Sequence, residues 1–194
     1  MIEAGRLIAD LAHHAAADAE EEASLLRMLR FLALSPDPFG RGNPEGHITG
    51  STVIGRPDGS AFLLVHHRKL DRWLQPGGHT DAADADVLAA ALREAREETG
   101  LLALAPALNG RPFDVDVHAI PERPGEPAHW HFDVRHLATT SETAAPAAQA
   151  DEVAGVRWFT LDQALAEGVD ASLARALRKA QRLLSPSPPG RGEG

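Results

Sequence analysis

The chain contains 194 residues, carries a formal net charge of −9 at pH 7 and has no cysteine. This length suffices for one compact domain with an added element, and the negative charge argues against nucleic acid or an anionic membrane as a partner. Without cysteine, the sequence excludes disulfides, thiolate catalysis and cysteine-bound zinc. It shows no export signal and no apolar run of membrane-spanning length, so we expect a cytoplasmic protein.

The first 34 residues are rich in Ala, Leu and Glu, and their apolar periodicity predicts two helices or one long helix. A segment dense in Pro and Gly follows and predicts a loop. We expect the helices to pack on the main body, and a homodimer formed through them is the alternative. The chain is thus divided into a helical extension (1–40), a main domain (41–184) and a disordered tail (185–194).

Strand and helix patterns alternate along the main domain. The segments ITGSTVIG and AFLLVHHR flank the turn RPDGS and predict a β-hairpin. A strong helix is predicted over VLAAALREAREET, with Asp86 as its N-cap and Gly100 as its stop. Further strands are predicted over PFDVDVHAI, HWHFDVRHLA and VAGVRWFT, and helices over LDQALAEG and ASLARALRKAQRLL. This order predicts an α+β fold with α/β/α layers and a sheet between helices.

Three glutamates of the central helix, Glu94, Glu97 and Glu98, are spaced i, i+3, i+4 and therefore share one helical face. Like charges at this spacing repel one another unless a positive group lies among them. A hydrated charged face is one interpretation, and a shared metal ion is the other. Carboxylate oxygens suit Mg²⁺ or Mn²⁺, whose coordination substrate phosphates often complete. Arg93, four residues before Glu97, could orient a carboxylate, and a free carbonyl in the preceding PGGH loop could add a ligand.

The segment GGHTDAADADVLAAALREAREETGL resembles the Nudix box of the MutT-like Nudix hydrolases, G-x5-E-x7-R-E-U-x-E-E-x-G-U, where U is aliphatic. Its second half matches at every fixed position. In the first half, Asp84 stands at the glutamate position and the loop is one residue longer, so the box covers residues 78–101. Asp86 could instead be the acidic residue at the first glutamate position of the box. The resemblance continues through GHITGSTVI, LLVHHRKLDRWLQPGGH and VRWFTLD, and so spans residues 47–162.

This resemblance implies a mixed sheet between helices and hydrolysis of a diphosphate bond in a nucleoside diphosphate linked to another moiety. Water would attack one phosphorus, and a nucleotide or phosphate would leave. Arg93 would orient the glutamates. The general base differs between members of the family, and here it would be a box glutamate or Glu152. The Mg²⁺ or Mn²⁺ ligands that the resemblance implies are Glu94, Glu97, Glu98 and the carbonyl of Gly77.

A non-catalytic Nudix-like domain that binds or senses a nucleotide is the alternative. Such domains usually lose box glutamates, which this chain keeps. Isopentenyl-diphosphate isomerases share the fold that this resemblance implies, but they use a catalytic cysteine, which this sequence lacks. The additional patterns of the ADP-ribose, diadenosine-polyphosphate and coenzyme A subfamilies are also missing, so the sequence does not select one compound.

Two predicted strands, DVDVHAI and HWHFDVRH, alternate so that pairing them would form one polar face beside the box. The residues on this face are Asp114, Asp116, His118, His129, His131, Asp133 and Arg135. We favour a substrate pocket here, with an extra transition-metal site and a hydrated sheet face as alternatives. His79, next to the Gly-rich loop, carries the same alternatives. Trp73, just before that loop, is core or a stacking platform for a base. The predicted substrate-binding residues are His118, His129, His131, Arg135 and Trp73.

Overall fold

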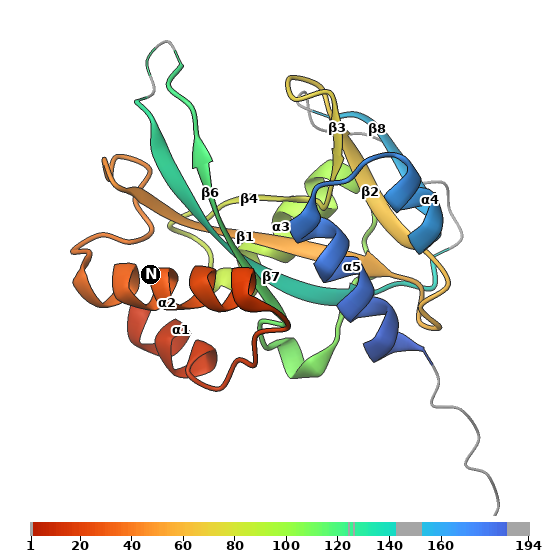
Figure 1. Ribbon diagram of the computed structural model, residues 1–194, viewed down its shortest axis with the longest axis horizontal. Coiled ribbons are helices and arrows are strands. Elements are labelled where there is room, and N and C mark those ends of the chain that lie inside the picture. Colours follow the sequence, from red (N-terminus) through yellow and green to blue (C-terminus); the bar gives the residue numbers. More distant parts are fainter. Residues whose placement is uncertain (1, 124, 126, 143–152, 186–194) are drawn as a thin grey trace, which may run out of the picture.

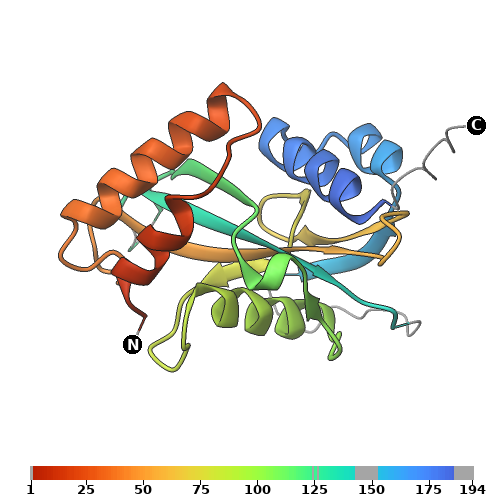
Figure 2. The same ribbon diagram turned by 90° about the horizontal axis from the view of Figure 1, so that it is seen from below.

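The computed structural model of the protein describes residues 2–123, 125, 127–142 and 153–185. These residues form one eight-stranded sheet between helices (Figures 1 and 2). The strands are β1 (Gly46–Gly55), β2 (Phe62–His67), β3 (Arg72–Leu74), β4 (Gly77–His79), β5 (Ala105–Pro106), β6 (Asp114–Ile120), β7 (His129–Thr139) and β8 (Val153–Phe159). The helices are α1 (Ala4–Leu11), α2 (Ala19–Leu34), α3 (Val87–Thr99), α4 (Leu161–Ala166) and α5 (Ala171–Leu184), with a short 3₁₀ turn, η1 (Leu108–Gly110).

The main path of the sheet has the order β3-β2-β1-β7-β5, while β4 pairs with β1, β6 with β7, and β8 with β2. Strands β1 and β7 are parallel along their full shared length, and the other pairs are antiparallel. The sheet is therefore mixed, and the predicted α+β fold with α/β/α layers is confirmed.

Both faces of the central strand β1 are buried, because successive side chains point to opposite sides of the sheet. Val53 belongs to the apolar cluster that includes α5, whereas Ile54 belongs to the cluster that includes α3. Figure 2 shows the resulting layers, with α3 below the sheet and α4 and α5 above it. The sequence pattern of β1, with few charges, is typical of a strand covered on both faces.

Helix α3 has the bounds that its sequence predicts. The side chain of Asp86 accepts a hydrogen bond from the backbone N–H of Ala89 at 2.8 Å and caps the first turn. Gly100 ends the helix at φ 71°, a left-handed conformation that glycine adopts without a steric penalty. These local signals fix where the glutamate-bearing face begins and ends.

The N-terminal residues form two helices that pack on the sheet. Met28 and Phe31 of α2 join Ile48 and Phe132 in one apolar cluster, and the rings of Phe31 and Phe132 stack at 4.0 Å between centroids. The division of the chain into an extension and a main domain stays a prediction. Apart from Ser185, the predicted tail lies outside the described residues. Among the described helices, none is both long and apolar enough to cross a lipid bilayer.

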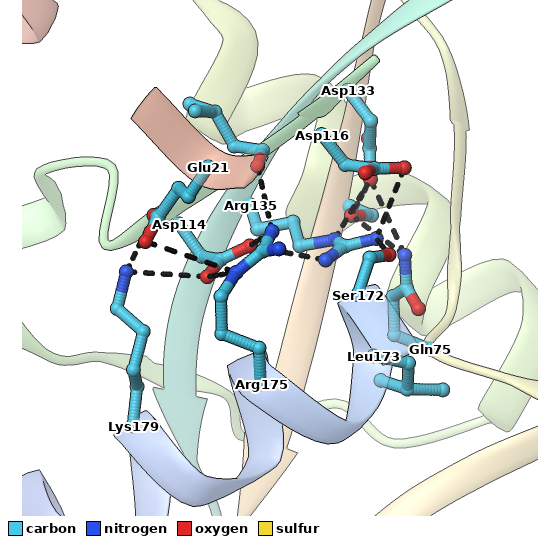
Figure 3. A network of polar contacts seen from close by, with 12 residues as sticks. Glu21, Gln75, Asp114, Asp116, Asp133, Arg135, Ser172, Leu173, Arg175 and Lys179 are labelled. Carbon is cyan, nitrogen blue, oxygen red and sulfur yellow. Dashed lines mark hydrogen bonds and ion pairs between the residues drawn. The ribbon is translucent and has the colours of Figure 1, made fainter. Parts of the chain in front are cut away.

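A buried network of charges links α5 to the edge strand β6 and to the start of α2 (Figure 3). Asp114, which is fully buried, accepts hydrogen bonds from Arg135 at 3.0 Å, Arg175 at 3.0 Å and Lys179 at 3.1 Å. Lys179 also binds Glu21 of α2 at 2.5 Å. Buried charges need partners of this kind because transferring an isolated ion out of water is costly.

Glu21 stays ionised in this network although it is buried. Burial alone would raise the pKa of its carboxyl group, but hydrogen bonds from His14, Lys179 and the backbone N–H of Ala17 lower that pKa to about 2. The negative charge of Glu21 therefore persists throughout the neutral range, and it compensates the charge of Lys179.

Candidate functional site

The box arginine is the centre of a group of carboxylates beside β4. Arg93 donates two hydrogen bonds to Asp84, from Nε to Oδ1 at 3.1 Å and from Nη2 to Oδ2 at 2.9 Å. Its Nη1 donates to Glu94 Oε1 at 2.7 Å and lies 3.6 Å from Glu97 Oε2. Nη2 also donates to the backbone carbonyl of His79 at 3.0 Å. One guanidinium group thus positions two carboxylates and the end of the Gly-rich strand.

Asp84, and not Asp86, is the early carboxylate that Arg93 binds. Its side chain is 7% exposed, and the hydrogen bonds from Arg93 lower its pKa below the usual range for aspartate. The carboxylate of Asp86 instead caps α3. The box pattern has a glutamate where this chain has Asp84, and the loop here is one residue longer. Asp84 nevertheless makes a two-point contact with Arg93.

On the expectation that Glu94 is a metal ligand, replacing Asp84 by asparagine should lower kcat by about 10- to 100-fold, the usual effect of losing a group that orients such a ligand. The amide cannot offer two acceptor oxygens to Arg93, so Glu94 and the carbonyl of His79 would lose their common anchor. Asp86→Asn is the matched control, because asparagine is as good an N-cap as aspartate. Steady-state kinetics on both variants checks this, and equal losses of kcat would contradict it.

The Gly-rich strand lies directly against the glutamate face of α3. Glu98 Oε2 accepts a hydrogen bond from the backbone N–H of Gly77 at 3.1 Å. At Gly77, an added Cβ would lie 2.5 Å from the Cα of Ser51, so only glycine allows β4 to lie this close to β1. At Gly78, an added Cβ would lie 2.7 Å from the carboxyl carbon of Glu94, which shows how closely this side chain approaches the strand. Glu97, by contrast, has a side chain that is 59% exposed. The carboxylates of Glu94 and Glu98 thus lie beside the two glycines.

A polar face extends across three neighbouring strands on the side of the sheet that α5 covers. The register pairs His47 of β1 with His131 of β7, and His131 with His118 of β6. The next row pairs Thr49, Asp133 and Asp116 in the same way. Strands β6 and β7 therefore pair, which was the condition for a polar face, and their polar side chains form one face.

Five histidines gather at one end of this face and are called the histidine cluster: His47, His79, His118, His129 and His131. His131 is at the centre, with ring centroids 4.8 Å from His47, 5.2 Å from His79 and His129, and 5.5 Å from His118. Burial lowers the pKa of His131 to about 2, and the neighbouring imidazoles add to this shift. Its ring is therefore neutral at physiological pH, with a lone pair available as an acceptor or ligand.

His47 was not among the residues singled out in the sequence. It is a member of the cluster only because β1 and β7 run parallel in register. His47 and His131 are separated by 84 positions, and no local pattern predicts a parallel pairing over that distance. The alternation of His47, Thr49 and Ser51 on one face is the single signal that the sequence offers.

A family model described as NUDIX domain matches residues 46–180. The chain belongs to the Nudix family. It is thus a Nudix-type pyrophosphohydrolase, and its predicted box lies within the matched residues. No match to the chain is found among curated proteins.

Solved structures with the same fold include Nudix proteins from several organisms. An Ap4A hydrolase from C. elegans aligns at a TM-score of 0.57 and 21% identity, covering 71% of this chain and 96% of the other. The NUDIX domain of Shewanella oneidensis NrtR, complexed with ADP ribose, aligns at 0.56 and 21%, covering 80% and 97%. The dihydroneopterin triphosphate pyrophosphohydrolase of E. coli aligns at 0.52 and 17%, covering 68% and 92%. At these identities the likeness shows the fold.

Two of the remaining predicted residues, Arg135 and Trp73, lie in different surroundings. Arg135 is 2% exposed, and its guanidinium group contacts Asp114, Asp133 and Ser172 inside the protein (Figure 3). Trp73 is partly buried, and its ring packs against Phe159 at 4.8 Å between centroids. Glu152, the predicted alternative general base, lies outside the described residues.

Proposed function

We propose that this Nudix hydrolase cleaves a diphosphate bond in a nucleoside diphosphate linked to another moiety, and that it requires Mg²⁺ or Mn²⁺. The observation that carries this proposal is the group of carboxylates that Arg93 holds against the Gly-rich strand. The proposed metal ligands are Glu94, Glu97, Glu98 and the carbonyl of Gly77.

The residues at this place fit a hard divalent cation. Glu98 lies beside Gly77 through their 3.1 Å hydrogen bond, and Glu94 lies beside Gly78. Carboxylate and carbonyl oxygens are the donors that Mg²⁺ and Mn²⁺ prefer, and the exposed Glu97 leaves room for water and phosphate. When bound, the ion supplies charge neutralisation for the diphosphate and for the leaving oxygen.

The chain's own residues position the reactants. Arg93 keeps Glu94 in place and fixes the His79 carbonyl, so the glutamate face and β4 move together. The oxygen of a water molecule forms a bond to one phosphorus, and the bridging P–O bond breaks with its electron pair going to the leaving nucleotide or phosphate. A box glutamate or Glu152 accepts the proton of the water.

We assign the polar face next to Gly77 to substrate binding. His118 has a side chain that is 45% exposed, so its imidazole can reach a phosphate or a base edge, with His129 and His131 behind it. Trp73 is the proposed platform for a base, and the buried Arg135 supports the face from inside. ADP ribose, with which the Shewanella domain was complexed, is a compound of the proposed class.

The test is a panel of nucleoside diphosphate compounds, assayed for release of phosphate and nucleotide with Mg²⁺ and then with Mn²⁺. We expect one compound to be hydrolysed in a metal-dependent manner, with products that identify the bond cleaved. Chelation of the metal is the control in each assay. Tight binding of a compound without turnover under any metal condition would overturn the proposal and favour a nucleotide-binding role.

A further inference from the structure

The histidine cluster contains three imidazoles whose ligand atoms converge. One nitrogen each of His47, His79 and His131 lies within 4.8 Å of the other two. A point midway between three atoms at this spacing is about 2.8 Å from each, and Zn–N bonds are about 2.0–2.1 Å long. Small side-chain rotations would therefore bring the three nitrogens to bonding distance of one ion, without any movement of the backbone.

The strands hold these histidines in fixed positions. His47 and His131 are direct neighbours in the parallel ladder of β1 and β7, and His79 is on β4, opposite Thr49 of β1. The Nε2 atom of His131 is buried and has no hydrogen-bond partner among the described residues. A buried polar atom of this kind usually has a partner, and a metal ion is one that the surrounding nitrogens can share.

The other two histidines of the cluster have the orientation that metal-binding imidazoles adopt. His129 Nδ1 donates to the carbonyl of Pro127 at 2.8 Å, and His118 Nδ1 donates to the carboxylate of Asp116 at 2.9 Å. A carbonyl or carboxylate partner on one ring nitrogen leaves the lone pair on the other, and this pairing is typical of the surroundings of metal-ligating histidines. Both rings pack against His131, and the buried His129 is the nearer of the two, so His129 is the candidate for the fourth position.

We propose that the histidine cluster binds one divalent transition metal ion of the Zn²⁺ class, with His47, His79 and His131 as ligands and His129 as the candidate for the fourth. Imidazole nitrogens select such ions over Mg²⁺, which prefers oxygen ligands. This site is separate from the glutamate site in its ligands and in the ions it takes. It adjoins that site, because the carbonyl of His79 is bound by Arg93.

The first experiment measures Zn²⁺ bound to the full chain, purified without an affinity tag, by equilibrium dialysis and elemental analysis in an excess of Mg²⁺. We expect one equivalent of Zn²⁺ that Mg²⁺ does not displace. Co²⁺ in place of Zn²⁺ is expected to give the visible absorption of a nitrogen-coordinated ion. Absence of stoichiometric Zn²⁺ would overturn the proposal.

Variants separate this site from the glutamate site. His131→Gln is expected to lose the Zn²⁺ equivalent but to keep Mn²⁺ bound, as followed by electron paramagnetic resonance. Glu98→Gln is expected to keep the Zn²⁺ equivalent but to lose bound Mn²⁺. The two metal sites can therefore be tested independently of each other. His13→Gln, at an exposed histidine of the N-terminal segment, is the matched control.

Folding of each variant is checked by circular dichroism. If His131→Gln does not fold, His79→Gln serves in its place, because its side chain is only partly buried and lies on the short strand β4. Zn²⁺ binding that both histidine variants retain would mean an adventitious surface site and would contradict the assignment.

Discussion

Replacing Glu98 by glutamine is expected to lower kcat by about 10²- to 10⁴-fold, the rate equivalent of the several kcal/mol that a bound metal ion supplies to the transition state. Glutamine has the same shape, and its amide oxygen can still accept the hydrogen bond from Gly77 that Glu98 accepts at 3.1 Å. The fold and the position of β4 should therefore persist. The lost element is one negative charge among the proposed metal ligands.

This prediction is checked by steady-state kinetics over a range of Mn²⁺ concentrations. A ligand role predicts that the variant needs more metal for the activity that remains, whereas a purely structural role predicts an unchanged metal dependence. Glu22→Gln, at an exposed position of α2, is the matched control and should behave as the wild type. Wild-type turnover by the Glu98 variant would contradict the proposed mechanism.

Local sequence signals predicted the central helix and the glutamates that share one of its faces. Asp86 and Gly100 mark the ends of α3 through a side-chain cap and a left-handed glycine, and both effects act over a few residues. The choice between Asp84 and Asp86 as partner of Arg93 was open, because Asp84 is one residue too far from Arg93 for the box pattern and Asp86 is one residue too close. It depends on the course of the loop, which places Asp84 and not Asp86 beside the guanidinium group.

The break between the two N-terminal helices was left undecided for a similar reason. The Ala-rich residues between α1 and α2 have high intrinsic helix propensity, which favours one long helix. Side-chain contacts override that propensity here. Asp18 caps the first turn of α2. The carboxylate of Glu21 accepts a hydrogen bond from the backbone N–H of Ala17 and contacts the imidazole of His14.

Contacts between residues far apart in the chain could not be predicted from local sequence patterns. His47 joins the histidine cluster through a parallel strand pairing, and Asp114 meets Arg175 across 61 positions. On a helical wheel, Arg175 and Lys179 of α5 resemble an ordinary hydrated face, because i and i+4 charges usually face solvent. The structure instead buries them against β6 and α2.

Asp114→Asn is expected to lower the free energy of unfolding by about 3–5 kcal/mol, the usual cost of removing one partner from a buried ion pair. The carboxylate of Asp114 contacts Arg135, Arg175 and Lys179, and it is fully buried. An amide would leave these three cations with one negative charge fewer and would place an N–H₂ group against their donors. Urea denaturation measures the change, with Asp162→Asn at an exposed position as the control.

A second substitution tests whether the loss comes from uncompensated charge. Lys179→Met removes one of the three cations, so in the Asp114→Asn background it should restore part of the lost stability, with an interaction energy of about 0.5–3 kcal/mol. Alone it should destabilise the protein, since Glu21 would lose its ion pair with Lys179. If the effects of the two substitutions simply add, the network does not act as a unit. Coupling between them would mean that shared charges hold α2, β6 and α5 together, in addition to the apolar packing of α2 on the Nudix sheet.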